Sequence, residues 1–234
     1  MITSKTYQKD SQEVINKDSS DLYKEVVAAN TLYACTYKAQ PNAFSRKRAA
    51  LLTCMDARLL PNEFMGFEAG DIHLIRNAGG RASDDAIRSL VISSRLLTTN
   101  QFFVVHHTDC GMQRFTNKSI HELLHDNVNV DEVTKIDYCN ATLKVPTLSK
   151  RYACKKVRYC CGKKSCVNYQ CIDWLTIQNG LFRSVLEDVK KIRQHPLIPA
   201  HIPIYGFIFD VMTGKLVPVS KAMKAGKAKS ICCL

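Results

Sequence analysis

Two short segments contain the residue types that bind zinc. Cys54 ends the apolar run 49–54, and His107 and Cys110 follow the apolar run 101–106. Both runs have the character of buried parallel strands, and ligands of such sheets bind beyond the carboxyl ends of the strands. Two thiolates and an imidazole suit tetrahedral zinc, and a site with three protein ligands keeps its fourth position for water. Because zinc lowers the pKa of that water to about 7, these residues predict a source of hydroxide at neutral pH.

Asp56 and Arg58 lie two and four residues after the first of these cysteines. A carboxylate beside a guanidinium stays ionised, can accept a hydrogen bond from a metal hydroxide, and is held off the metal by a bidentate pair. Each residue alone has a simpler explanation, because buried cysteines, core histidines and surface ion pairs are common. Their joint position at two matching strand ends favours the metal site.

The segments around these residues predict an α/β fold. The runs 49–54, 71–76 and 101–106 are expected to be strands, and Ser83 with the two aspartates after it starts a helix between the second and the third. Strands joined by helical crossovers form a parallel sheet covered by helices on both faces. The other expected elements are a helix from Ser20 or Asp21 to 37, a helix at 179–193, and a closing hairpin of 204–209 with 215–219.

The expected organisation is one domain at 20–219, preceded by a flexible arm at 1–19 and followed by a basic tail at 220–234. A stretch at 138–171 interrupts the domain and contains six of the eleven cysteines, eight lysines or arginines and no acidic residue. It contributes +8 of the net charge of +12, and the tail adds four lysines, so the remaining chain is about neutral. The basic balance is therefore local, and it does not by itself indicate a nucleic-acid partner.

Three interpretations of residues 138–171 stay open. The cysteines among lysines and tyrosines superficially suit a zinc module that contacts nucleic acid, but their spacing contains no C-x2-C pair. The stretch has neither helical nor alternating periodicity, which favours a surface loop. Its composition also fits translated noncoding sequence spliced into a finished domain.

The N-terminus and the cysteines favour the cytoplasm. The first twenty residues have no apolar segment typical of a signal peptide, and their acidic residues without arginine argue against a transit peptide. An odd number of cysteines excludes complete pairing, and no run reaches the eighteen apolar residues of a membrane span. Cys232 and Cys233 leave palmitoylation open, whereas the prenylation box fails because Ile231 stands where its cysteine is needed.

Cys-X-Asp-X-Arg at 54–58, followed by His-X-X-Cys at 107–110, resembles the β-class carbonic anhydrases. The segments GDIHLIRNAGG and GFIFDVMTGKLVPV resemble the same family. The resemblance covers about residues 20–130 and 173–219. It is strongest to the subgroup with CMDAR and HHTDCGM, which also contains carbonyl sulfide hydrolases and is related to carbon disulfide hydrolases.

The resemblance implies Cys54, His107 and Cys110 as the ligands of one Zn²⁺ per subunit, with Asp56 and Arg58 as the catalytic pair. It also implies that Asp56 itself binds the metal in an inactive closed state, as the aspartate does in some members of the family. The resemblance also implies a mainly parallel central sheet of about five strands flanked by helices. It further implies a homodimer or a larger homo-oligomer, in which an N-terminal helix embraces the partner and the cleft lies at the subunit interface.

His106 also has a spacing to Cys110 that allows metal binding, but the motif match selects His107. Successive strand residues point to opposite faces, so His106 is expected to pack in the core or to support the site from behind. The implied activity is the reversible hydration of CO2 to bicarbonate and a proton, that is, carbonate dehydratase activity. Hydrolysis of carbonyl sulfide or carbon disulfide at the same zinc is the alternative, since nothing in the motifs separates these substrates.

Overall fold

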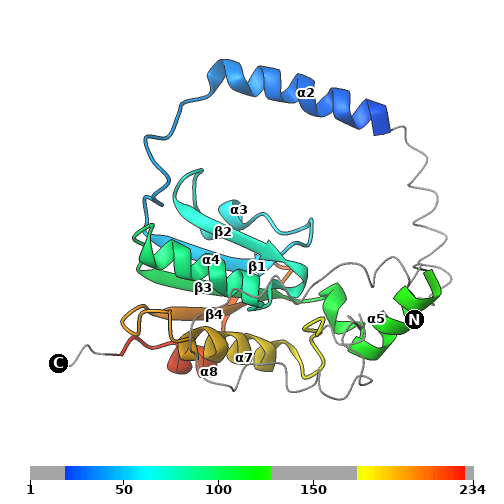
Figure 1. Ribbon diagram of the computed structural model, residues 1–234, viewed down its shortest axis with the longest axis vertical. Coiled ribbons are helices and arrows are strands. Elements are labelled where there is room, and N and C mark those ends of the chain that lie inside the picture. The colour runs from blue at the N-terminus through cyan, green and yellow to red at the C-terminus, as the bar shows by residue number, and fades with distance from the viewer. Residues whose placement is uncertain (1–18, 128–172, 230–234) are drawn as a thin grey trace, which may run out of the picture. The chain divides into compact units, whose positions relative to one another are not determined.

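The computed structural model describes residues 19–127 and 173–229 (Figure 1). The chain divides into two compact units, residues 1–42 and 43–234, and the first contains helix α2 (Ser19–Thr36). The elements of the second unit are β1 (Ala49–Cys54), α3 (Pro61–Met65), β2 (Ile72–Asn77), the 3-10 turn η1 (Ala78–Gly80), α4 (Asp84–Arg95), β3 (Gln101–His107), the 3-10 turn η2 (Gly111–Gln113), α5 (Asn117–Asn127), α7 (Leu181–Gln194), β4 (Ile204–Phe209), β5 (Leu216–Pro218) and α8 (Ser220–Ala225). The stretch at 138–171 and all but the last residue of the expected arm lie outside the described residues.

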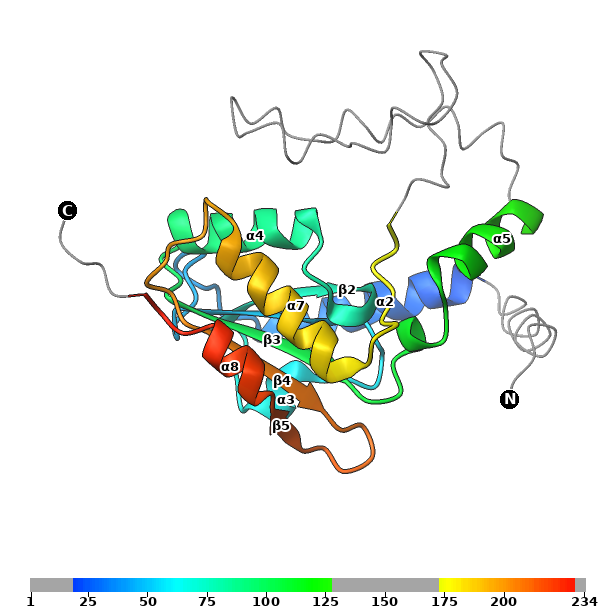
Figure 2. The same cartoon turned by 90° about the horizontal axis from the view of Figure 1, so that it is seen from below.

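The second unit is built on a five-stranded sheet of order β2-β1-β3-β4-β5 (Figures 1 and 2). Strands β1 to β4 run parallel, and β5 returns antiparallel to β4. Strand β1 is an apolar run buried along its whole length because it lies between β2 and β3. The predicted mainly parallel sheet and its closing hairpin are confirmed, and the carboxyl ends of β1 and β3 lie side by side.

Helices α4, α7 and α8 pack on one face of this sheet (Figure 2). Helix α4 begins where predicted, since the Ser83 hydroxyl accepts a hydrogen bond from the backbone N–H of Ala86 at 3.2 Å. In α7 the side chains of Val185, Val189 and Ile192 form one stripe and are fully buried. The sheet residues beneath these helices are Ala50, Leu52, Phe102, Val104, Ile204 and Ile208.

The opposite face of the sheet has a thinner cover in the part of the chain that the structure describes. The short helix α3 places Phe64 against Phe209, with ring centroids 4.4 Å apart. Beside them Phe103, Tyr205 and Phe207 lie next to one another and are only half-buried. The expected helical cover on both faces is therefore uneven, and the second face keeps accessible aromatic surface in the single chain.

The C-terminal boundary of the domain differs from the expected one at residue 219. Residues 220–225 form α8, whose Ala222 is fully buried, where a solvated tail was expected. A Cβ atom added at Gly206 of β4 would lie only 2.7 Å from the Ala222 methyl group. Small residues on both elements thus let helix and strand approach closely, so the domain includes α8.

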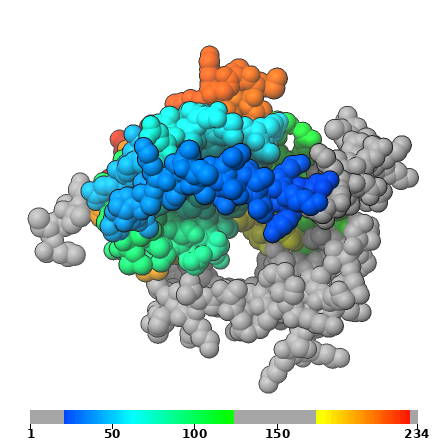
Figure 3. Space-filling view, turned by 90° about the horizontal axis from the view of Figure 1, so that it is seen from above, coloured from blue at the N-terminus to red at the C-terminus, as the bar shows by residue number. Residues whose placement is uncertain are grey.

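Helix α2 belongs to the unit 1–42, so the sheet unit begins at Ala43 rather than at residue 20. Helix α2, drawn in dark blue in Figure 3, has large apolar side chains that are exposed in the single chain. Among them are Leu22, Tyr23, Val26, Val27, Leu32 and Tyr33. None of the described helices combines the length and the hydrophobicity that crossing a bilayer requires.

Candidate metal centre

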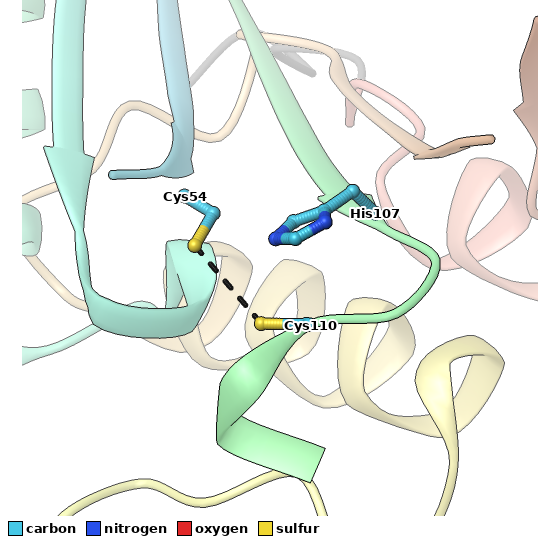
Figure 4. Close-up of side chains that lie close together, drawn as sticks. All are labelled: Cys54, His107 and Cys110. Carbon is cyan, nitrogen blue, oxygen red and sulfur yellow. Dashed lines mark hydrogen bonds between the residues drawn. The ribbon is translucent and has the colours of Figure 1, made fainter. Parts of the chain in front are cut away.

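Three candidate ligands meet where β1 and β3 end (Figure 4). Cys54 is the last residue of β1, His107 is the last residue of β3, and Cys110 follows in the turn after β3. Their ligand atoms lie within 4.8 Å of one another, and all three side chains are buried. The parallel pairing of β1 with β3 thus brings together the three residues that the sequence analysis grouped.

The imidazole of His107 is arranged as a metal ligand would be. Its Nδ1 donates a hydrogen bond to the backbone carbonyl of Thr108 at 2.9 Å, which places the ring proton on that nitrogen. Its Nε2 is buried and has no hydrogen-bond partner in the described chain. An unpaired buried lone pair is costly unless something binds it, and a cation between this nitrogen and the two sulfur atoms satisfies it.

The two cysteine side chains lie against each other at the strand ends. Their Sγ atoms are 4.0 Å apart and form a hydrogen bond. This bond lowers the pKa of Cys54 more than burial raises it, and backbone N–H groups of Asp56 and Gly79 add to the lowering. The same contact, together with burial, raises the pKa of Cys110. A divalent cation bound by both sulfur atoms would balance the charge of two thiolates, so this donor pair suits zinc.

Strand β2 and the turn after it contact the backbone at Cys54, the end of β1. Gly80 has φ of +66°, which favours glycine, and a Cβ atom there would lie 2.9 Å from the backbone nitrogen of Cys54. The side chain of Arg76 donates to the carbonyl oxygens of Cys54 at 3.0 Å and Asp56 at 2.7 Å. The end of β1 is therefore fixed from its neighbouring strand as well as by its own sheet bonds.

Asp56 and Arg58 form the bidentate pair that the sequence predicts. Arg58 donates from Nε to Oδ1 of Asp56 at 3.0 Å and from Nη2 to Oδ2 at 2.8 Å, and its backbone N–H also reaches Oδ1 at 3.0 Å. The hydrogen bonds from the guanidinium lower the pKa of Asp56 to about 2. Oδ2 of Asp56 lies 3.8 Å from Nε2 of His107, so this carboxylate borders the three-ligand group.

Arg58 has a second carboxylate partner that the sequence analysis missed. Nη1 of Arg58 donates to Oδ2 of Asp109 at 2.9 Å, and Nη2 donates to the backbone oxygen of Asp109 at 3.1 Å. Arg114 donates to the other carboxylate oxygen of Asp109 at 2.5 Å. In the sequence, only the position of Asp109 between His107 and Cys110 indicates that it lies near the site. The spacing does not show that its side chain points toward Arg58.

Comparison with known proteins agrees with this geometry. A family model described as carbonic anhydrase matches residues 49–216. Beta-carbonic anhydrase 1 of Mycobacterium tuberculosis is 31% identical over 196 residues, which are 84% of this chain and 96% of that protein. The chain belongs to the β-carbonic anhydrase family. The crystal structure of a carbonic anhydrase from Streptococcus mutans also matches, with a TM-score of 0.64 and 32% identity over 85% of this chain and 96% of that one.

Some relatives in the same similarity range carry a different name. A carbon disulfide hydrolase of Saccharolobus solfataricus is 32% identical over 171 residues, 73% of this chain and 76% of that protein. Identity therefore does not separate the two kinds of relative, in line with the subgroup resemblance of the sequence motifs.

In this member of the β-carbonic anhydrase family, His106 faces away from the metal centre. Its ring is fully buried against α7, where Nδ1 lies 3.0 Å from the Ser184 hydroxyl. Nε2 lies 3.0 Å from Oδ2 of Asp188, without the alignment of a hydrogen bond. Asp188 also accepts a hydrogen bond from Nε of Arg81 at 2.8 Å. The prediction that His106 packs behind the site is confirmed, and the three ligand candidates exclude it.

Proposed function

We propose that the chain binds one Zn²⁺ through Cys54, His107 and Cys110 and catalyses the reversible hydration of CO2 to bicarbonate and a proton. The observation that carries this proposal is the buried three-donor group, in which Nε2 of His107 has no hydrogen-bond partner among the residues that the structure describes. When bound, zinc supplies a water of lowered pKa, about 7, and thus a nucleophile at neutral pH. Membership of the β-carbonic anhydrase family supports the substrate.

Asp56 and Arg58 are the catalytic pair in this proposal. Asp56 is ionised at neutral pH and lies next to the ligand group, so it can accept a hydrogen bond from a water held there. Arg58 occupies both oxygens of that carboxylate and keeps it from turning toward the metal. Without this pairing Asp56 can itself become a ligand, which is the closed, inactive state.

Hydrolysis of carbonyl sulfide or carbon disulfide is the second candidate. The carbon disulfide hydrolase of S. solfataricus has about the same identity to this chain as Beta-carbonic anhydrase 1 of M. tuberculosis, over a smaller share of both chains. All these substrates have an electrophilic carbon that the same nucleophile attacks. The substrate must therefore be decided by the access route and not by the ligands.

The active assembly in this proposal is a homodimer or larger homo-oligomer. The half-buried aromatics Phe103, Tyr205 and Phe207 and the exposed apolar side chains of α2 are surfaces that a second copy can cover. We place the protein in the cytoplasm, where Cys54 and Cys110 stay reduced for metal binding. The proposal includes no nucleic-acid partner, and it treats 138–171 as an interruption of the zinc domain.

The experiment that decides between the substrates is a paired assay on one zinc-loaded preparation. Stopped-flow CO2 hydration and hydrogen sulfide release from carbonyl sulfide and carbon disulfide are measured at the same enzyme concentration. The proposal expects CO2 hydration to dominate. Sulfide release with CO2 hydration at the uncatalysed rate would replace it by the hydrolase alternative.

A further inference from the structure

Arg58 is held between two carboxylates that come from different strand ends. Asp56 follows β1 and belongs to the same turn as Arg58, whereas Asp109 follows β3, fifty-one positions further along than Arg58. Asp109 receives Nη1 of Arg58 on its carboxylate and Nη2 on its backbone oxygen. Its own orientation is fixed by Arg114 on the second carboxylate oxygen.

The backbone of Asp109 is adapted to this contact. Its φ is +54°, in the left-handed region that aspartate and asparagine tolerate better than most other residues. The carboxylate that accepts from Arg58 and Arg114 therefore belongs to a turn of restricted backbone conformation directly before Cys110.

Arg58 needs such an anchor because it is half exposed. Its side chain is 48% exposed, and a long side chain in water gains rotamer freedom when it detaches. Asp56 lies in the same turn, so its bonds to Arg58 do not fix the guanidinium relative to the end of β3, where His107 lies. The hydrogen bonds to Asp109 fix the guanidinium relative to the end of β3, because they connect the two strand ends that carry the ligands.

We propose that Asp109 is a positioning residue that fixes Arg58 in the orientation holding Asp56 away from the metal. This inference rests on the proposed zinc site. Loss of the Asp109 carboxylate lets Arg58 turn outward, and the freed Asp56 carboxylate, already 3.8 Å from Nε2 of His107, turns toward the metal.

The test is Asp109→Asn, which keeps the size of the side chain and tolerates the left-handed backbone. Arg58 and Arg114 donate to different carboxylate oxygens of Asp109, and asparagine replaces one of these acceptors by an NH2 donor and removes the negative charge. We expect kcat/KM for CO2 hydration to fall about two- to fivefold, as for a half-exposed ion pair. Zinc content and the thermal midpoint should stay within the range of a matched control, Asp85→Asn, which removes the exposed Arg88–Asp85 pair of 2.8 Å elsewhere.

The visible spectrum of the Co²⁺-substituted protein distinguishes a positioning role of Asp109 from a merely structural one. This spectrum responds to a carboxylate that replaces water on the metal. Arg58→Ala provides the reference for a freed Asp56, and Asp56→Asn the reference for a residue that cannot bind as an anion. We expect Asp109→Asn to shift the spectrum toward that of Arg58→Ala, and the double variant with Asp56→Asn to lose this shift.

Two results would overturn the proposal. One is an Asp109→Asn spectrum that superimposes on that of the unmodified protein, and the other is a shift that persists in the double variant. Because the spectrum requires only bound Co²⁺, it reports on Asp109 even if the protein fails to hydrate CO2. Failure of the substrate proposal and failure of the Asp109 proposal are thus separate outcomes.

Discussion

Replacing Asp188 by asparagine should destabilise the domain strongly, because Asp188 is the counter-charge of a buried arginine. The side chains of Asp188 and Arg81 are 3% and 9% exposed, and Oδ2 of Asp188 lies 2.8 Å from Arg81 Nε and 3.0 Å from His106 Nε2. Removing one partner of a buried ion pair costs about 3–5 kcal/mol. Arg81 keeps hydrogen bonds to the carbonyls of Leu175 and Thr176, so we expect the lower end, about 3 kcal/mol.

The thermal midpoint converts this loss into a measurable shift. For a domain of this size about 2–4 °C corresponds to 1 kcal/mol, which predicts a fall of about 6–12 °C for Asp188→Asn. The assay is thermal unfolding of the zinc-loaded protein followed by circular dichroism, with a urea midpoint as a second measure. Glu187→Gln is the matched control: Glu187 lies 3.8 Å from the same arginine but is 43% exposed, so it should cost less than about 1 kcal/mol. Equal shifts for the two variants would refute the account of the buried pair.

Three further predictions concern the metal centre. Cys54→Ser should lower zinc affinity by more than about 100-fold, which is the largest loss expected for a residue that only supports a ligand. Metal analysis of the purified variant measures this loss, and full zinc occupancy would show that Cys54 is not a ligand. Asp56→Ala and Arg58→Ala should each lower CO2 hydration by about 10²–10⁴-fold while zinc stays bound, and unchanged turnover in either variant would contradict its catalytic role. The depressed pKa of Asp56, about 2, means that its ionised form stabilises the fold above about pH 4 and that this contribution is lost as the pH falls toward 2. Acid unfolding of Asp56→Asn should therefore show a smaller loss of stability in that window than the unmodified metal-free protein, and identical acid curves would show that the pair with Arg58 adds nothing.

The position of the site could be predicted because it depends on local patterns. The apolar runs 49–54 and 101–106 are short, the first buried throughout and the second mostly buried, and their parallel pairing brings Cys54 and His107 to the same edge of the sheet. Strand alternation puts His106 and His107 on opposite faces of the sheet, the motif match selects His107 as the ligand, and the structure places His106 against α7. The first feature follows from parallel strand pairing and the second from the two-residue period of a strand, and neither depends on details of packing.

The features that the sequence did not predict depend on contacts between distant segments. The bond between Asp109 and Arg58 requires a left-handed backbone at Asp109, which no residue pattern indicates. Helix α8 has the lysine-rich sequence of a solvated tail, but its Ala222 is fully buried next to Gly206 of β4 and its Ala225 packs against the same core. Small residues such as Gly and Ala let two elements pack closely, but they hardly change the hydrophobic periodicity from which burial is predicted.

Measuring CO2 hydration against zinc content tests directly whether the chain is a zinc-dependent carbonic anhydrase. Stopped-flow rates are recorded for full-length protein at a series of zinc loadings, from metal-free to one zinc per chain. We expect the rate to rise in proportion to bound zinc and to level off at one equivalent. Protein that binds one equivalent of zinc and leaves CO2 hydration at the uncatalysed rate would contradict this expectation.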